Sequence, residues 1–88
     1  MNDIKLKPSE KATLLVLYKV CKGSLKCHVP IEAIQAKFKK HERHVPVKAL
    51  RILARLGLVV RHPTKGGVTY QLTRIGKEYV ETQLREFL

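Results

Sequence analysis

The chain has 88 residues, of which 44% are hydrophobic and 28% are charged, as is typical of one small globular domain. This length excludes large multi-layer enzyme folds. The longest unbroken aliphatic or aromatic run covers residues 14–18, whereas a membrane-spanning helix needs roughly 18 apolar residues. We therefore expect a soluble protein with neither a membrane span nor a signal peptide.

The net charge points to the class of partner. Eighteen Lys and Arg residues against seven Asp and Glu residues give a formal net charge of +11, more than solubility requires of a small domain. Residues 37–74 hold most of this excess, because ten basic residues against one acid give them a net charge of +9. We infer a polyanionic partner, with its contact surface in the middle of the chain.

The N-terminal part of the sequence predicts an arm and two helices. Residues 1–8 read as a short extended arm, and Ser9 is the predicted N-cap of a helix over residues 9–22 that stops at Gly23. A short amphipathic helix is predicted over residues 30–39, with Pro30 at its first position. The chain is thus divided into an arm, residues 1–8, and one domain, residues 9–88.

A third helix is predicted over residues 46–56, after a polar turn at residues 40–44. Pro46 is expected to open this helix and to hold Val45 in an extended conformation, and Gly57 is expected to end it. At 100° per residue the helix has an apolar side for packing and a cationic side opposite. The apolar side comprises Ala49, Leu50, Leu53 and Leu56, and the cationic side comprises Lys48, Arg51 and Arg55.

The C-terminal part predicts a β-hairpin and a last helix. Residues 58–62 and 68–73 alternate as strands, joined by a loop at residues 63–67. The side chains expected to face the core are Leu58, Val60, Val68, Tyr70 and Leu72. Thr73 is expected to cap a helix that runs to the C-terminus. Its apolar strip, which needs a partner surface, comprises Ile75, Tyr79, Val80, Leu84, Phe87 and Leu88.

Two groups of residues carry a family resemblance. Leu50, Leu53, Leu56, Gly57, Leu58 and Val59 mark the end of the third helix and the start of a strand. Tyr70, Leu72, Thr73 and Gly76 form a Tyr-x-Leu-Thr-x-x-Gly pattern. Over residues 9–80 the sequence resembles the winged helix-turn-helix family of small bacterial and archaeal transcription regulators. The resemblance implies an α+β, mostly α fold with a three-helix core, a two-stranded wing and a C-terminal helix.

The resemblance also implies a nucleic-acid interface, with the third helix in the major groove and the wing beside the backbone. Arg51 is the first choice for a base contact, because a guanidinium binds O6 and N7 of guanine together. This sequence departs from the family at residues 44–46, which replace the usual Ser or Thr near the start of the recognition helix. The predicted nucleic-acid-binding residues are Lys39, Lys40, Arg43 and His44 in the turn, Lys48, Arg51 and Arg55 in the helix, and Arg61 and Lys65 in the wing.

The expected function is that of a double-stranded DNA-binding transcription regulator or chromatin-associated factor in the cytoplasm. The alternative is an RNA-binding ribosomal or ribosome-associated winged-helix protein, and a third hypothesis is a protein-interaction module. A homodimer through residues 9–22 and 74–88 would present two recognition helices to one duplex.

The cysteines and acids give little support for a metal site or for catalysis. Five residues separate Cys21 from Cys27, and no CxxC pair occurs, so we expect both thiols to be reduced. Structural zinc and a Cys21–Cys27 disulfide are the less favoured alternatives. The acids are scattered, and no nucleophile motif or phosphate-binding loop is found. We therefore expect no enzyme activity, no metal and no cofactor.

Overall fold

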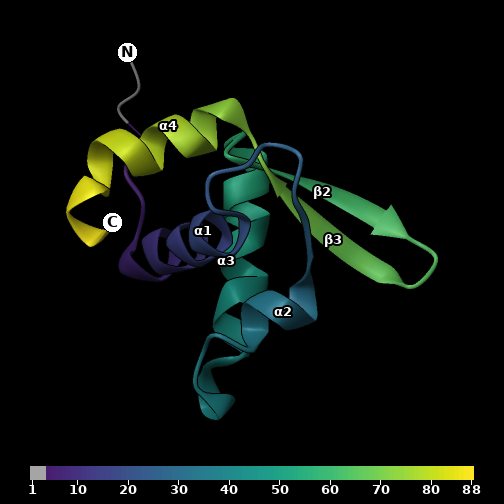
Figure 1. The fold of residues 1–88 in the computed structure, drawn as a ribbon. Coiled ribbons are helices and arrows are strands. Elements are labelled where there is room, and N and C mark those ends of the chain that lie inside the picture. The colour runs from purple at the N-terminus through teal and green to yellow at the C-terminus, as the bar shows by residue number, and fades with distance from the viewer. Residues whose placement is uncertain (1–3) are drawn as a thin grey trace.

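The computed structural model describes residues 4–88, so the first three residues of the predicted arm lie outside the described residues. The described chain has an α+β fold with four α-helices and a three-stranded antiparallel sheet (Figure 1). The predicted α+β class is confirmed. The elements are α1 (Pro8–Cys21), β1 (His28–Pro30), α2 (Ile31–Gln35), α3 (His44–Arg55), β2 (Val59–Thr64), β3 (Gly67–Leu72) and α4 (Arg74–Gln83), with two 3₁₀ turns, η1 (Lys40–Glu42) and η2 (Arg85–Phe87).

Helix α1 begins at Pro8, before the predicted N-cap Ser9. Lys7, rather than Ser9, is the extended residue at the cap, and its backbone N–H donates a hydrogen bond of 2.9 Å to Oε1 of Glu10. Pro8 takes the first helical position, where its missing N–H costs no hydrogen bond. Leu6 is buried in the hydrophobic core, so the described part of the predicted arm packs against the domain at this residue.

A left-handed turn ends α1 at the predicted place. Lys22 and Gly23 have φ values of 53° and 77°, and the Gly23 N–H donates to the carbonyl of Tyr18 at 3.0 Å. Glycine adopts this conformation without steric cost, which explains why the helix stops here. The turn sends the chain back along the end of α1 towards β1.

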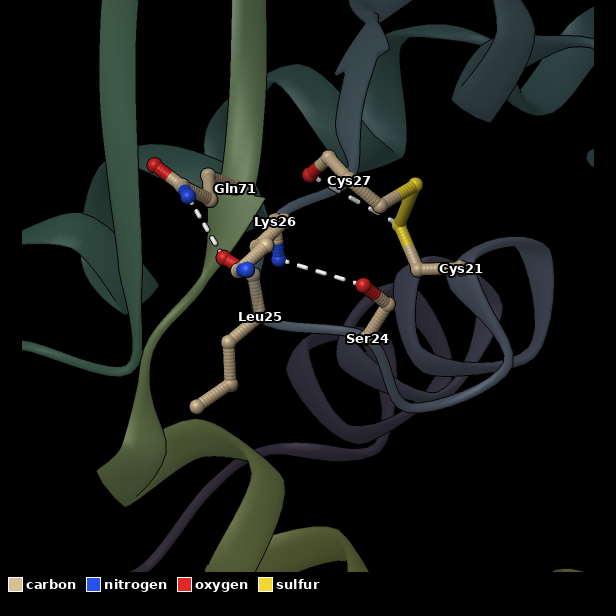
Figure 2. Close-up of a disulfide and its surroundings, with 6 residues drawn as sticks. All are labelled: Cys21, Ser24, Leu25, Lys26, Cys27 and Gln71. Carbon is tan, nitrogen blue, oxygen red and sulfur yellow. Dashed lines mark hydrogen bonds between the residues drawn. A yellow bond between two sulfur atoms is a disulfide. The ribbon is translucent and has the colours of Figure 1, made fainter.

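A disulfide joins Cys21 at the end of α1 to Cys27 just before β1 (Figure 2). The prediction that both cysteines are reduced is therefore wrong. The left-handed turn is the reason, because it brings the two Cα atoms to 5.6 Å, within the usual range for a disulfide. The side-chain amide of Gln71 on β3 also donates to the Leu25 carbonyl in the enclosed loop.

Strand β1 is not predicted by the sequence pattern. It has three residues and pairs antiparallel with β3, with Val29 opposite Tyr70. The sheet order is β1-β3-β2, so β1 is an edge strand. Pro30 is compatible with that position, because an edge strand does not need every backbone N–H for pairing. The presence of a proline in so short a segment obscures the strand in the sequence.

Helix α2 is shorter than the predicted helix over residues 30–39. It ends at Gln35, and Pro30 lies before it as the extended cap residue rather than at its first helical position. The remaining residues belong to a long turn that contains η1 and projects below α2 in Figure 1.

Helix α3 begins at His44, two residues before the predicted start. Val45, which was expected to be extended, is helical, and Pro46 is the third helical residue. The first four N–H groups of a helix have no partner within it, so a proline at this position breaks no hydrogen bond. The helix ends at Arg55 and is followed, as predicted, by Gly57, which has a φ of 80°.

Strand β2 is one residue longer than predicted, β3 has its predicted length but begins one residue earlier, and the turn between them is shorter. Strand β2 extends to Thr64 and β3 begins at Gly67, so only Lys65 and Gly66 form the turn. The Thr64 hydroxyl donates to the Gly67 carbonyl at 2.8 Å. The hairpin extends away from the helices (Figure 1).

The inward-facing residues of the hairpin differ from the prediction at one position. Leu58, Tyr70 and Leu72 are buried as expected, and Val68 is half-buried. Val60, however, is 41% exposed, whereas Val59 is buried opposite Leu72. The strand starts at Val59, so the alternation is shifted by one residue, and Leu58 is buried as part of the turn that follows α3.

Thr73 caps α4 as predicted and also ties it to α3. Its hydroxyl oxygen accepts the Gly76 N–H at 3.0 Å and donates to the Gly57 carbonyl at 2.7 Å. Gly76 lies against the backbone of Leu58, and an added Cβ would come within 2.0 Å of the Leu58 carbonyl oxygen. The end of α3, the start of β2 and the start of α4 thus meet at this junction.

The core lies between the helices and one face of the sheet. The largest fully buried side chains include Leu14 and Leu17 from α1, Ile34 from α2, Leu50 and Leu53 from α3, and Val80 from α4. Leu56, predicted to pack, is 41% exposed because α3 has ended before it. None of the helices in residues 4–88 is long and apolar enough to cross a membrane.

The apolar strip predicted near the C-terminus is only partly buried. Tyr79 and Leu84 pack in the core of the same chain, whereas Ile75, Phe87 and Leu88 are 46%, 53% and 56% exposed. Helix α4 ends at Gln83 rather than continuing to the C-terminus. The change to the 3₁₀ turn η2 takes the last apolar residues off the buried side of the helix.

Candidate functional site

Helix α3 separates its apolar and cationic side chains as its periodicity predicts. Leu50 and Leu53 are fully buried, whereas Lys48, Arg51 and Arg55 are exposed. The buried side packs mainly on α1, which crosses α3 in Figure 1. The core therefore fixes which side of α3 is turned to solvent, and the three basic side chains extend from that side.

One groove runs between α3 and the N-terminal turn of α1. This α1–α3 groove has a volume of about 430 Å³. Its basic lining comes from two segments of the chain, because Lys7 is the cap residue before α1 and the other cations belong to α3. Glu10 is the acid that lines it, and its carboxylate already accepts the backbone N–H of Lys7. The lining residues are Lys7, Ser9, Glu10, Lys48, Ala49, Arg51, Ile52 and Arg55.

A second groove lies on the other side of Arg51, where α2, α3 and the hairpin meet. This α3–hairpin groove has a volume of about 310 Å³ and is lined by both Arg51 and Arg61. Arg61 on β2 lies opposite the buried Tyr70 on β3, so its side chain is on the same face of the sheet as Tyr70. The remaining lining residues are Ile31, Gln35, Val47, Val68 and Tyr70.

The structure thus brings four of the nine predicted residues together. Lys48, Arg51 and Arg55 line the α1–α3 groove, and Arg61 joins Arg51 in the α3–hairpin groove. Arg51 borders both grooves, so it lies on the ridge between them. Arg51 thus links the cations of the two grooves, and we call this set of four residues the cationic ridge: Lys48, Arg51, Arg55 and Arg61.

The other five predicted residues are exposed but line neither groove. Lys39, Lys40, Arg43 and His44 lie in the turn before α3 or at its start, and Lys65 lies at the tip of the hairpin. In Figure 1 the turn lies beyond the N-terminal end of α3, and the hairpin extends away to the side. The side chain of Gln35 on α2 braces the turn, because its amide donates to the Arg43 carbonyl at 2.9 Å.

The lining residues that are absent from the sequence-based set include three with side-chain hydrogen-bond donors: Lys7, Ser9 and Gln35. Lys7 and Ser9 lie about forty positions before α3 in the sequence, and only the packing of α1 on α3 brings them to the ridge. Periodicity within one helix cannot reveal such a contact. Gln35 is the last residue of α2, whereas the sequence pattern predicts that this helix continues to residue 39.

Histidines on the outer face of the sheet form a separate small cluster. The rings of His28 on β1 and His62 on β2 have centroids 4.6 Å apart, and Nε2 of His62 lies 2.7 Å from Oε1 of Gln71. Within residues 4–88 no group of three or more His, Cys, Asp or Glu side chains is arranged to hold a metal ion. With the cysteines joined to each other, the thiolate ligands of the zinc alternative are also occupied.

Two tyrosines have a raised pKa: Tyr18 on α1, which contacts α4, and Tyr79 on α4 itself. The Tyr18 hydroxyl donates to Oε2 of Glu81 at 2.7 Å, and this hydrogen bond is the main cause that raises the pKa of Tyr18 above its usual 10.0. Burial raises the pKa of Tyr79. Both phenols are protonated at neutral pH, and their hydrogen bonding and burial fit a structural role in holding α4.

Comparison of the chain with protein-family models and with curated proteins gives no match in either case.

Proposed function

We propose that this protein is a winged-helix protein that binds double-stranded DNA, as a small transcription regulator or chromatin-associated factor. In this proposal α3 is the recognition helix and enters the major groove, while β2 and β3 form the wing beside the backbone. The turn before α3 contacts phosphates at the other end of the interface. Cytoplasmic localisation is part of this proposal. The homodimer through residues 9–22 and 74–88 stays a separate prediction, on which the proposed DNA interface of the single chain does not depend.

The observation that carries the proposal is the cationic ridge. Arg51 from α3 and Arg61 from β2 line one groove although they come from different elements, and Lys48 and Arg55 continue the surface along α3. The ridge belongs to a segment with ten basic residues and one acid. A clustered surface of one sign is the electrostatic feature expected for a protein that neutralises phosphates.

The dimensions of α3 also support a duplex partner. An α-helix with its side chains is about 10–12 Å across, close to the roughly 12 Å width of the major groove of B-DNA. Helix α3 has twelve residues, and only residues 56–58 separate it from the hairpin, so the helix can enter a groove with a basic strand beside it. Structured RNA has a deep and narrow major groove that does not admit side chains in this way, which favours DNA.

The test is a fluorescence anisotropy titration of the full chain against random-sequence duplex DNA and structured RNA of equal length at several salt concentrations. We expect tighter binding to the duplex DNA, with log affinity falling linearly as log salt rises. Tighter binding to the RNA would replace the proposal with the ribosome-associated alternative. Failure to bind either nucleic acid at low salt would leave a protein-interaction module.

A pair of double variants with equal changes in charge controls for net charge. Lys48→Ala/Arg55→Ala removes one Lys and one Arg from the cationic ridge, and Lys19→Ala/Arg85→Ala removes one of each from exposed positions outside both grooves. The ridge variant should reduce the salt slope by about two and weaken binding, whereas the control should change both only slightly. Equal effects would indicate binding through net charge rather than through this surface.

A further inference from the structure

We propose that the N-terminal turn of α1 is part of the nucleic-acid interface, and that Lys7 and Ser9 bind a backbone phosphate at the α1–α3 groove. This inference rests on the proposed function, because the phosphate belongs to the nucleic acid that α3 contacts. It extends the interface to a segment far from α3 in the sequence, on the side of the ridge away from the hairpin.

The groove has the side chains that a phosphate requires. Lys7 faces the same groove as Lys48 and Arg55, so cations from two elements converge on it. Ser9 adds a hydroxyl donor, and lysine and serine are among the side chains that commonly contact phosphate oxygens.

The one acid in the groove does not cancel this charge. Glu10 is only 8% exposed, and its Oε1 accepts the backbone N–H of Lys7 at 2.9 Å. The carboxylate is therefore engaged in capping α1 below the surface, while Lys7, Lys48 and Arg55 are exposed. An incoming phosphate would meet the cations first.

The α1–α3 groove lies on one side of α3, so in the proposed complex it faces the phosphate backbone of one DNA strand. Arg51 borders the α1–α3 groove on one side and the α3–hairpin groove on the other. A helix that fills the major groove has a phosphate backbone along each side. In this arrangement Arg61 approaches one strand from the hairpin, and Lys7 and Ser9 approach the other strand from α1.

The structure also separates Lys7 from the other lysine of the first turn. Lys11 lines a different groove of about 510 Å³, together with the apolar residues Ala12, Leu15 and Phe87. Both lysines are exposed, and they lie four residues apart. A change at Lys7 can therefore be compared with a change of the same charge at Lys11, on a face that the proposal does not use.

The test is the salt dependence of duplex DNA binding by Lys7→Ala and Lys11→Ala, measured by fluorescence anisotropy between 50 and 200 mM salt on the full chain. Lys7→Ala should lower the magnitude of the slope of log affinity against log salt by about 0.9, so that its loss of affinity over this range is about threefold smaller than that of the wild type. The effect should be the same for every duplex sequence. Lys11→Ala should keep the wild-type slope.

Ser9→Ala gives a second, independent readout. Loss of a neutral hydroxyl donor should weaken binding between about twofold and tenfold and leave the salt slope unchanged, because no charge is removed. Lys7→Ala keeps the backbone hydrogen bond to Glu10, and a thermal melt of each variant verifies that α1 is intact.

The outcomes separate this inference from the proposed function. If Lys48→Ala/Arg55→Ala reduces the slope but Lys7→Ala behaves as Lys11→Ala does, the α1 contact is wrong and the proposed interface stands. If the ridge variant has no effect either, or if the wild type does not bind duplex DNA, both proposals are overturned. Equal losses in Lys7→Ala and Lys11→Ala would also overturn the phosphate site, because they would reflect net charge alone.

Discussion

At the scale of single residues, the pattern Tyr-x-Leu-Thr-x-x-Gly has a physical basis. Tyr70 and Leu72 fill the core from the inward side of β3, and Thr73 ends the strand by capping α4. Gly76 is required because a Cβ would collide with the Leu58 carbonyl oxygen. Each residue of the pattern maintains the junction between the hairpin and the helices, so it predicts architecture rather than a nucleic-acid target.

Arg51 is the residue whose substitution should change sequence preference. Its place between the two grooves makes it the member of the ridge nearest to the middle of the proposed interface. Arg51→Ala should cost about 1–3 kcal/mol of binding free energy on a preferred duplex site and should flatten the sequence preference. The measurement is anisotropy on a site selected from random duplexes, compared with a scrambled site.

Arg51→Lys is the matched variant for this prediction, because it keeps the charge and removes the two-pronged guanidinium. It should retain binding to the scrambled site and lose preference for the selected site. An Arg51→Ala variant with unchanged affinity and unchanged preference would show that α3 is not the recognition helix.

Among the elements, β1 is held in place partly by the disulfide that directly precedes it. The bond fixes the start of β1 to the end of α1, and β1 then pairs with β3 through only three residues. Gln71 strengthens this connection, because its side chain contacts both the enclosed loop and His62 on β2. A short strand of this kind has little pairing energy of its own, so the covalent link contributes to keeping it in the sheet.

Removal of the disulfide should therefore lower stability by a predictable amount. The cysteines are six positions apart, and closure of so short a loop corresponds to about 2 kcal/mol of free energy of unfolding at 25 °C. Cys21→Ala/Cys27→Ala should show this loss in urea denaturation followed by circular dichroism.

A dithiol reductant provides the control for the alanine substitutions. It should lower the midpoint of the wild-type protein by a similar amount and leave the double variant unchanged. A wild-type midpoint that does not respond to the reductant would contradict a stabilising bond between these cysteines.

At the scale of the whole molecule, the fold divides the charge among a central ridge and two projecting segments. The slope of log affinity against log salt measures how many of these cations meet phosphate, at about 0.9 per contact. Arg51 is assigned to a base and is therefore not counted. The phosphate contacts proposed for Lys7 and for the other three residues of the cationic ridge predict a slope of about −4. If the four Lys and Arg residues of the turn and the hairpin tip also take part, the predicted slope is about −7.

The measured slope for wild-type protein on duplex DNA therefore reports the extent of the interface. A value near −4, unchanged by Lys39→Ala or Lys65→Ala, would show that the turn and the hairpin tip do not take part. A slope close to zero would contradict an electrostatic interface of any extent.

The sequence alone predicts those features of this fold that follow from helix periodicity and from residues that end or cap elements. Gly23, Gly57 and Thr73 mark real ends of elements, and the cationic side of α3 follows from its 3.6-residue period. The missed features depend on contacts between distant segments. The disulfide, strand β1 and the approach of Lys7 to α3 require the folded chain to bring together residues that the local pattern does not connect.

The two prolines in the sheet have a consequence for self-association. β1 and β2 form its two edges, and they contain Pro30 and Pro63, respectively. A proline has no backbone N–H to offer, so neither edge presents an unbroken row of donors to a strand from another molecule. Growth of the sheet into fibrils is thereby hindered at both ends, and contacts between copies of this protein are directed to its side-chain surfaces.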